Sequence, residues 1–163
     1  VARAIRTRLP MAVLMLEPDL LGEDTGGARQ DGESLLCSMV ELVQNRIRSQ
    51  DIVGRYGACE LLLVLPDTSA QGAARLAEQL CDAARDLPPL PGGTPALTLS
   101  VGVFGGRLEP GDSWDQLIHA ADQALEQARQ YGGNRVHTTA TLGRMAHAGM
   151  MTSSHATFPT SLH

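Results

Sequence analysis

The sequence predicts an α/β fold, in which helices flank a central mixed β-sheet. Three observations lead to this prediction: short apolar runs typical of strands, longer segments whose apolar residues recur every three or four positions, and two strand candidates close enough to form a hairpin. The chain has 163 residues, of which 43% are hydrophobic and 3% are aromatic. These values suit one domain of typical size with an aliphatic core.

The chain begins with a predicted strand and a predicted helix. Residues 11–16 form a continuous apolar run, which is typical of a buried strand, and Pro18 closes it. Residues 20–30 are rich in glycine and acidic residues, so we expect a loop. The segment 31–47 should be a helix, because its apolar residues line one face. Those residues are Leu36, Met39, Val40, Val43 and Ile47.

The middle of the chain predicts a hairpin followed by a second helix. Strands are expected over residues 51–56 and 60–65, and Gly57 between them supplies an unusual backbone angle at the turn. The residues from Thr68 to Gln71 fit a capping box, so a helix should begin there and run to about residue 85.

The last third of the chain predicts a strand, a helix and a final short strand. Residues 87–95 form a proline- and glycine-rich loop, and the apolar and small residues that alternate over 97–103 indicate a half-buried strand. Ser113 to Gln116 form a second capping box, and the helix that follows should end at Gly132-Gly133. Residues 134–137 are expected to add the last strand.

We divide the chain into one domain over residues 11–137 and two flanking segments. Residues 1–10 are expected to be a linker or the end of a preceding helix, and residues 138–163, which have no apolar period, a flexible C-terminal extension. The chain starts at Val1 without a methionine or a signal peptide, so we expect a piece of a longer protein. The expected location is the cytoplasm, or the cytoplasmic part of a membrane-tethered protein.

Charge, hydropathy and cysteine content exclude several classes of function. The formal net charge of -5 and the absence of a basic groove argue against binding of a nucleic acid polymer. The most apolar stretch, Pro10 to Leu16, is too short for direct membrane insertion. Cys37, Cys59 and Cys81 are odd in number and widely spaced, which fits neither a disulfide framework nor a zinc site and favours a reducing compartment.

Five short blocks in chain order carry a resemblance to a known family. They are Glu17-Pro-Asp19, Gly32-Glu33-Ser-Leu-Leu36, Arg55-Tyr-Gly57-Ala58-Cys59-Glu60-Leu61, Ser100-Val-Gly-Val103, and the final block from Ala121-Asp122 through Arg129 to Gly133-Asn134-Arg135-Val136. Together they resemble the GGDEF (diguanylate cyclase) domain family of bacterial second-messenger signalling. The resemblance covers about residues 11–137 and implies the family's cyclase-like mixed sheet surrounded by helices.

The hairpin block resembles the signature motif of that family, but the residues at its catalytic positions are replaced. The family reads Arg-Tyr-Gly-Gly-Asp/Glu-Glu-Phe, where this chain has Gly57-Ala58-Cys59-Glu60-Leu61 after Arg-Tyr. In the family, the third hairpin residue is acidic and central to a reaction that divalent metal assists. A thiol at Cys59 is a soft ligand that is poorly matched to magnesium, and Ala58 replaces a glycine that lets phosphates approach the backbone.

Other positions that the resemblance assigns to the active site have also shifted. Glu17 stands for an aspartate, Glu33 stands where an aspartate reads the guanine base, and Gly133 replaces an arginine, whereas Asp19 and Arg129 keep their charge. The asparagine that contacts guanine has no clear counterpart, and Asp24 or Thr25 is nearest. We therefore expect a degenerate domain that is not an enzyme, with no catalytic residue, metal or cofactor.

An Arg-x-x-Asp pair, Arg48 and Asp51, survives upstream of the hairpin at the family's spacing to Gly57. The resemblance implies that this pair is the inhibitory site that binds the product, cyclic di-GMP. The residue types suit that ligand, since arginine makes bidentate contacts to the guanine edge and a carboxylate accepts from the guanine N1 and amino groups. Both side chains would need to be exposed on one surface.

A second arginine often completes this site in the family. Gln79 occupies its place by alignment, so Arg75 or Arg85 would substitute for it. Two ordinary interpretations of the pair remain open: Arg48 could favour a helix C-terminus, or it could form a surface salt bridge with Asp51.

Three functional hypotheses follow. The first is an inactive GGDEF domain that binds cyclic di-GMP as a receptor and passes the signal on. The expected partners are attached domains of a longer protein, a separate protein, or a second copy of the chain in a homodimer. The second is an interaction module that binds no nucleotide and exposes an apolar patch. The third is residual cyclase or GTP-binding activity, which would require metal-dependent binding at Glu17 and Glu60.

Overall fold

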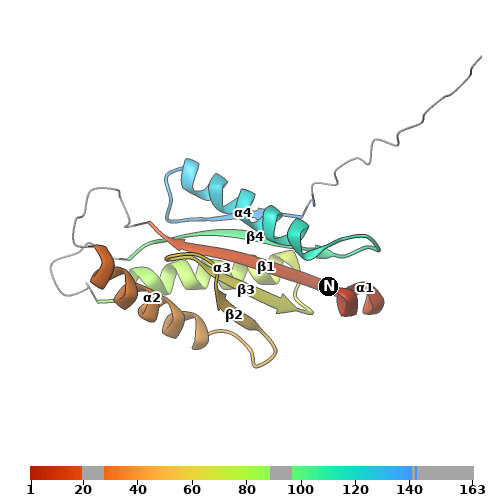
Figure 1. The fold of residues 1–163 in the computed structure, drawn as a ribbon, viewed down its shortest axis with the longest axis horizontal. Coiled ribbons are helices and arrows are strands. Elements are labelled where there is room, and N and C mark those ends of the chain that lie inside the picture. The colour runs from red at the N-terminus through yellow and green to blue at the C-terminus, as the bar shows by residue number, and fades with distance from the viewer. Residues whose placement is uncertain (20–27, 89–96, 141, 143–163) are drawn as a thin grey trace, which may run out of the picture.

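One mixed β-sheet of five strands forms the centre of the molecule, with helices on both of its faces (Figure 1). A computed structural model describes residues 1–19, 28–88, 97–140 and 142. The elements in chain order are α1 (Ala2–Thr7), β1 (Pro10–Pro18), α2 (Ala28–Gln44), β2 (Ile52–Arg55), β3 (Leu61–Pro66), α3 (Ala70–Arg85), β4 (Leu99–Arg107), α4 (Trp114–Gln130) and β5 (Val136–Thr139). The expected α/β fold is confirmed, and α1 occupies residues that were expected to be a linker or the end of a preceding helix.

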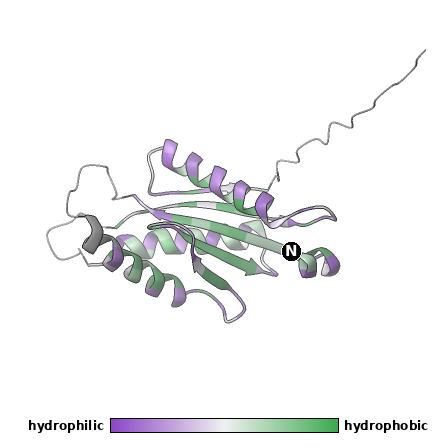
Figure 2. Ribbon diagram, in the orientation of Figure 1, coloured by the Kyte–Doolittle hydropathy of each residue, from purple (hydrophilic) through white to green (hydrophobic). Residues whose placement is uncertain are grey.

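The sheet order is β2-β3-β1-β4-β5, so β1 lies in the middle and is buried on both faces. Leu14 and Leu16 contribute to the core beneath α2 and α3, whereas Val13 and Met15 contribute to the core beneath α4 and α1. A strand with two buried faces needs apolar residues at every position, which explains the continuous run in the sequence. In Figure 2 apolar residues concentrate on the sheet, and hydrophilic residues lie on the outer sides of the helices.

Antiparallel pairing joins the first four strands of the sheet, and only the last pair is parallel. β1 pairs antiparallel with both β3 and β4, and β2 pairs antiparallel with β3 to make the expected hairpin. β5 pairs parallel with β4, after α4 has crossed one face. In this register Glu17 lies opposite Ser100, which brings the end of β1 next to the start of β4.

Two helix boundaries differ from the sequence prediction. α2 covers Ala28–Gln44 rather than 31–47, because the chain after residue 44 leaves regular helix geometry while Arg46 and Ile47 both still donate to the Val43 carbonyl. The N-cap of α3 is Ser69, whose Oγ accepts from the Gly72 N–H, so the expected capping box at 68–71 was wrong. The hydroxyl of Thr68 donates instead to the Pro66 carbonyl at 2.9 Å.

The capping box at Ser113 is confirmed, since its side chain accepts from the Gln116 N–H and the Gln116 side chain accepts from the Ser113 N–H. The expected loop at 20–30 lies outside the described residues over 20–27. Within the described part of the chain, no helix is both long enough and apolar enough to cross a membrane.

Candidate functional site

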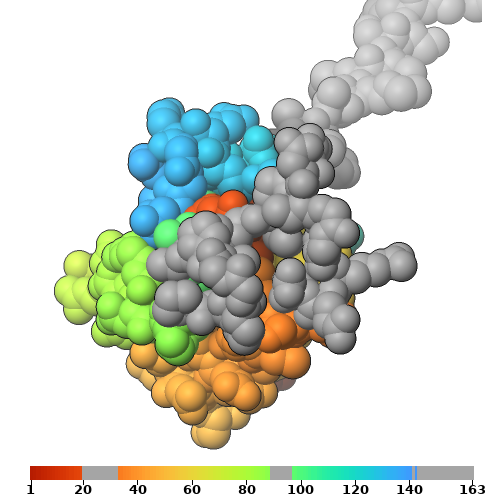
Figure 3. Space-filling view, turned by 90° about the vertical axis from the view of Figure 1, so that its left-hand side faces the viewer, coloured from red at the N-terminus to blue at the C-terminus, as the bar shows by residue number. Residues whose placement is uncertain are grey.

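The residues singled out by the sequence lie in two separate places. One is a group at the end of β1, which we call the β1-end cluster: Glu17, Asp19, Glu60 and Arg129. Figure 3 looks onto this end of the molecule, where the end of β1 emerges between α4 and α3. The other is the connection between α2 and β2, which carries Arg48 and Asp51.

Asp19 organises the backbone at the end of β1. One carboxylate oxygen accepts from the Thr98 hydroxyl at 2.7 Å and from the Asn134 N–H at 2.8 Å, and the other accepts from the Ser100 hydroxyl. These bonds join the end of β1 to the start of β4 and to the α4–β5 turn. Both oxygens are therefore already engaged by the protein itself.

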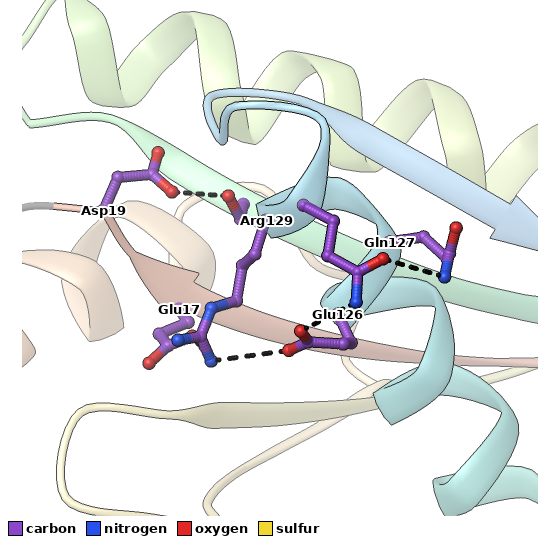
Figure 4. Close-up of polar contacts among 7 residues, drawn as sticks. Glu17, Asp19, Glu126, Gln127 and Arg129 are labelled. Atoms are coloured by element: carbon purple, nitrogen blue, oxygen red, sulfur yellow. Dashed lines mark hydrogen bonds and ion pairs between the residues drawn. The ribbon is translucent and has the colours of Figure 1, made fainter.

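Glu17 faces a single cation. Its carboxylate lies 3.1 Å from an Arg129 guanidinium nitrogen, and the same nitrogen lies 3.9 Å from Glu126. Figure 4 shows Arg129 reaching from α4 toward the end of β1. Burial raises the pKa of Glu17, and this outweighs the lowering by Arg129, while the charges of Glu60 and Asp19 raise it further. Arg129 is thus paired with carboxylates, although it also lines a pocket of about 250 Å³ together with Glu17, Asp19 and Gly133.

Gly133 leaves no room for a side chain. Its φ is +67°, a region that favours glycine, and a Cβ built there would lie 2.7 Å from an Asp19 carboxylate oxygen. The sequence resemblance places an arginine of the family at this position. Any such side chain would displace the Asp19 carboxylate and with it the anchor of the Asn134 backbone.

Arg55 holds the hairpin turn closed. Its Nε donates to the Gly57 carbonyl at 3.0 Å, and a terminal nitrogen donates to the Ala58 carbonyl at 2.8 Å. The other terminal nitrogen pairs with Glu33 of α2 at 3.3 Å. The Glu60 side chain covers Gly57, because a Cβ on that glycine would overlap the Glu60 carboxylate. The turn is therefore fixed by its own residues and by α2.

Cys59 is half-buried, and burial raises the pKa of its thiol. The nearby Arg55 lowers that pKa, whereas the charges of Glu33, Glu17 and Glu60 raise it again. Nucleophilic cysteines have a lowered pKa, because the thiolate is the reactive form. The raised pKa therefore favours an inert thiol at Cys59 over a reactive one.

The β1-end cluster does not fit a magnesium site. Mg²⁺ requires several hard oxygen ligands in near-octahedral geometry. Here Asp19 is engaged by three donors, Glu17 is paired with Arg129, and Cys59 presents sulfur. No group of three or more His, Cys, Asp or Glu side chains among the described residues is arranged to hold a metal ion.

The Arg48–Asp51 segment has a different arrangement. The Asp51 carboxylate accepts from the Arg48 backbone N–H at 2.8 Å, and the Asp51 N–H donates to the Arg48 carbonyl at 3.0 Å. Asp51 is half-buried, and its second carboxylate oxygen is enclosed and has no hydrogen-bond partner among the described residues. Asp51 thus shapes the loop, and one of its acceptor sites stays unsatisfied.

The Arg48 side chain is exposed, and neither ordinary interpretation of it fits this geometry. It forms no ion pair with Asp51 or with any other described residue, so the pair is not a surface salt bridge. It also lies four residues beyond Gln44, where α2 ends, and interaction with a helix dipole fades within the last turn.

Arg75 and Arg85 lie at different ends of α3. Arg85 bonds to Asn134 at 2.8 Å and pairs with Asp82, next to the β1-end cluster. Arg75, ten residues earlier and therefore about 15 Å away along the helix, is exposed and has no ion pair among the described residues. Figure 1 shows that the N-terminal half of α3 lies toward the C-terminal end of α2. Gln79, also exposed, lies one turn after Arg75.

Sequence reasoning missed the partners of residues that the resemblance assigns to the active site. Thr98 and Ser100 bind Asp19, and Arg55 closes the hairpin, yet none was singled out for those roles. The alternation of residues 98 and 100 places both on one face of a strand. Only the register of β1 with β4 reveals that Asp19 lies beside them.

Comparison with known proteins identifies a single family. The family described as diguanylate cyclase, GGDEF domain, matches residues 2–135. Diguanylate cyclase DosC of Escherichia coli strain K12 is 34% identical over 142 residues, which cover 83% of this chain and 30% of DosC. The chain therefore spans less than a third of the length of that relative.

Solved structures of GGDEF domains resemble the fold. The active GGEEF domain of a diguanylate cyclase from Vibrio cholerae is 29% identical, with a TM-score of 0.74 over 86% of this chain and 89% of that one. The GGDEF domain of DgcB from Caulobacter crescentus, solved in complex with c-di-GMP, has a TM-score of 0.75 over 84% of this chain and 82% of that one. At 22% identity, DgcB supports the fold alone.

Proposed function

The chain belongs to the diguanylate cyclase, GGDEF domain family, and we propose that it binds cyclic di-GMP without synthesising it. In this proposal the domain is a receptor or regulatory module, and ligand binding to it regulates attached domains or a partner protein. The observation that carries it is the contrast between its two sites. In the β1-end cluster Glu17 pairs with Arg129 and Asp19 is bonded to the β4 and α4–β5 segments, whereas Arg48 is exposed and has no ion pair among the described residues.

The Arg48 segment supplies the chemistry that a guanine edge requires. A free guanidinium donates two parallel hydrogen bonds to guanine O6 and N7, or stacks on the base. Asp51 holds the backbone of Arg48, and its unsatisfied oxygen can accept from a ligand N–H once the loop opens around it. Arg75, rather than Arg85, is the proposed second cation, because Arg85 is engaged with Asp82 and Asn134.

The altered hairpin supports the absence of synthesis. A cyclase must hold a triphosphate and its metal close to the hairpin backbone. Here Arg55 occupies the carbonyls of Gly57 and Ala58, Cys59 replaces the acidic residue, and Arg129 is neutralised by Glu17. Groups that act as a unit fail together, so we expect neither cyclase activity nor metal-dependent GTP binding.

A second candidate, binding of a protein partner without nucleotide, is favoured by one observation. β2 is an edge strand, and Ile52 at its start and Tyr56 directly after its end are 60% and 53% exposed. An exposed strand edge with apolar side chains suits addition of a strand from another chain. This candidate predicts that substitution of Arg48 has no effect on function.

Isothermal titration calorimetry with cyclic di-GMP tests the proposal. We expect Arg48→Ala to weaken binding by about 1–3 kcal/mol, the range for a good bidentate guanine contact. The matched control is Arg46→Ala, because Arg46 is an exposed arginine two residues away that follows α2 and donates to the Leu42 carbonyl of that helix. The control should bind like the wild type.

Equal affinity of the Arg48→Ala variant and the wild type would contradict the ligand site. Chromatographic detection of cyclic di-GMP made from GTP and Mg²⁺, lost in Glu60→Ala, would contradict the inactive assignment. Because the two readouts are independent, either half of the proposal can fail alone.

A further inference from the structure

A cavity of about 530 Å³ lies at the end of the sheet opposite to the β1-end cluster. Its lining comes from α1, the connection to β1, the end of β4 and the residues after it: Ile5, Arg6, Arg8, Arg107, Leu108, Glu109 and Pro110. Figure 1 shows α1 at this end, whereas β1 ends at the other. The eight steps from Pro10 to Pro18 separate the two ends by roughly 25 Å.

Three arginines converge on this cavity without a partner carboxylate. Arg6, Arg8 and Arg107 come from three different segments, all are exposed, and none forms an ion pair within the described residues. Glu109 is the one carboxylate among the lining residues. In a chain whose formal net charge is -5, this is a local excess of positive charge that attracts anions.

The backbone at Arg8 fixes where the chain leaves α1. Arg8 has a φ of 55°, in the left-handed region that commonly ends a helix. Its side chain lines the cavity from the connection between α1 and β1, and Arg107 lines it from the end of β4.

We propose that this cavity binds a small phosphorylated molecule of nucleotide size. A phosphate monoester carries up to two charges on three terminal oxygens, so it balances more positive charge than a single carboxylate and offers one oxygen to each of three guanidinium groups. The apolar wall of Ile5, Leu108 and Pro110 suits the body of such a molecule. The volume lies within the range of small-molecule sites.

This site is distinct from the one proposed for cyclic di-GMP and does not rest on it. Arg48 and Asp51 belong to the α2–β2 connection, whereas the cavity is built from α1 and β4. A ligand here would bridge α1 to the sheet, so its binding should also raise the melting temperature.

The test uses the whole chain and adenosine 5′-monophosphate as the probe, titrated by calorimetry, with inorganic phosphate and adenosine as comparison probes. We expect the monophosphate to bind the wild type more tightly than phosphate, and adenosine not to bind. Arg107→Ala and Arg8→Gly should each weaken binding about tenfold or more, as expected for loss of a charge-assisted bond. Arg8→Gly also relieves the left-handed backbone, so a folding defect is not expected.

Arg3→Ala is the matched control, since Arg3 lies one turn before Arg6 on α1 but does not line the cavity. It should bind like the wild type, and Arg48→Ala should leave this binding unchanged as well. Three results would overturn the proposal: no binding at millimolar monophosphate, equal loss in Arg3→Ala and Arg107→Ala, or tighter Arg107-dependent binding of hexaglutamate than of the monophosphate. The last result would indicate an acidic peptide instead.

Discussion

At the scale of single residues, two aspartates illustrate how an identical chemical group acquires different roles. Asp19 has both carboxylate oxygens bonded, to Thr98, Ser100 and the Asn134 backbone. Asp51 uses one oxygen on the Arg48 backbone and leaves the other unsatisfied. A motif predicts which carboxylate is present at a position. Only the fold determines whether that carboxylate remains available to a ligand.

The pKa of Glu17 gives a prediction at this scale. Because burial raises that pKa, the folded state holds the proton more tightly than the unfolded chain. The contribution of Glu17 to stability is therefore present at low pH and lost as pH rises through the raised pKa. A glutamine at position 17 does not ionise, so the Glu17→Gln variant does not lose this stability as pH rises. The melting temperature of the variant minus that of the wild type should therefore increase from about pH 4 to about pH 7.

Scanning calorimetry at several pH values measures this difference. Glu41→Gln is the matched control, because Glu41 is an exposed carboxylate on α2 and its removal changes the net charge equally. If the melting temperature of Glu17→Gln minus that of the wild type stays constant or falls as pH rises, the ion pair with Arg129 affects the pKa of Glu17 more than burial does.

At the scale of elements, α4 lies unusually close to β4. A Cβ on Gly102 would overlap the Ala121 carbonyl oxygen and the backbone of Leu125, so the helix rests directly on the strand backbone at this point. The sequence showed Gly102 only as one of the small residues of an alternating strand. Its role in helix–sheet packing depends on where α4 crosses, which a linear pattern does not specify.

We therefore expect Gly102→Ala to lower the free energy of unfolding by about 1–3 kcal/mol, the usual cost of overpacking a core. Gly54→Ala on the edge strand β2 is the matched control, because a Cβ there meets nothing within 4 Å. It should be neutral or slightly stabilising. Urea denaturation compares the two variants, and similar midpoints would mean that α4 shifts without cost.

Helix ends were the least predictable part of the fold. Leu36, Met39 and Val43 were expected on the buried face of a helix and are buried there, because periodicity reflects burial directly. The cap of α3 was assigned to Thr68 instead of Ser69, because adjacent hydroxyl residues offer the same chemistry one position apart. The resemblance located the candidate site residues. It did not predict that Arg55 donates to the carbonyls of the hairpin turn, or that Asp19 accepts from Thr98, Ser100 and the Asn134 backbone.

At the scale of the whole molecule, the C-terminal boundary follows from the packing of β5. The strand runs to Thr139 and pairs with β4, and Leu142 packs against the core beneath α4. Residues 143–163 lie outside the described part of the chain. The boundary expected after residue 137 would therefore cut within β5.

We predict that a chain ending at Leu142 melts at nearly the same temperature as the full chain. A chain ending at His137 should melt lower, because it loses the pairing of Thr138 and Thr139 with β4 and the packing of Leu142. Thermal unfolding followed by circular dichroism measures both. A large drop in the melting temperature of the chain ending at Leu142 would show that residues beyond 142 stabilise the domain.

The central claim is that this domain recognises the product of its family without using the substrate. One calorimetric experiment tests it most directly: GTP with Mg²⁺ is titrated into the wild-type protein first, and cyclic di-GMP is titrated into the same sample afterwards. We predict no binding heat from GTP, followed by saturable binding of cyclic di-GMP with the affinity measured in the absence of GTP. Saturable GTP binding, or no heat from cyclic di-GMP at large excess, would contradict it.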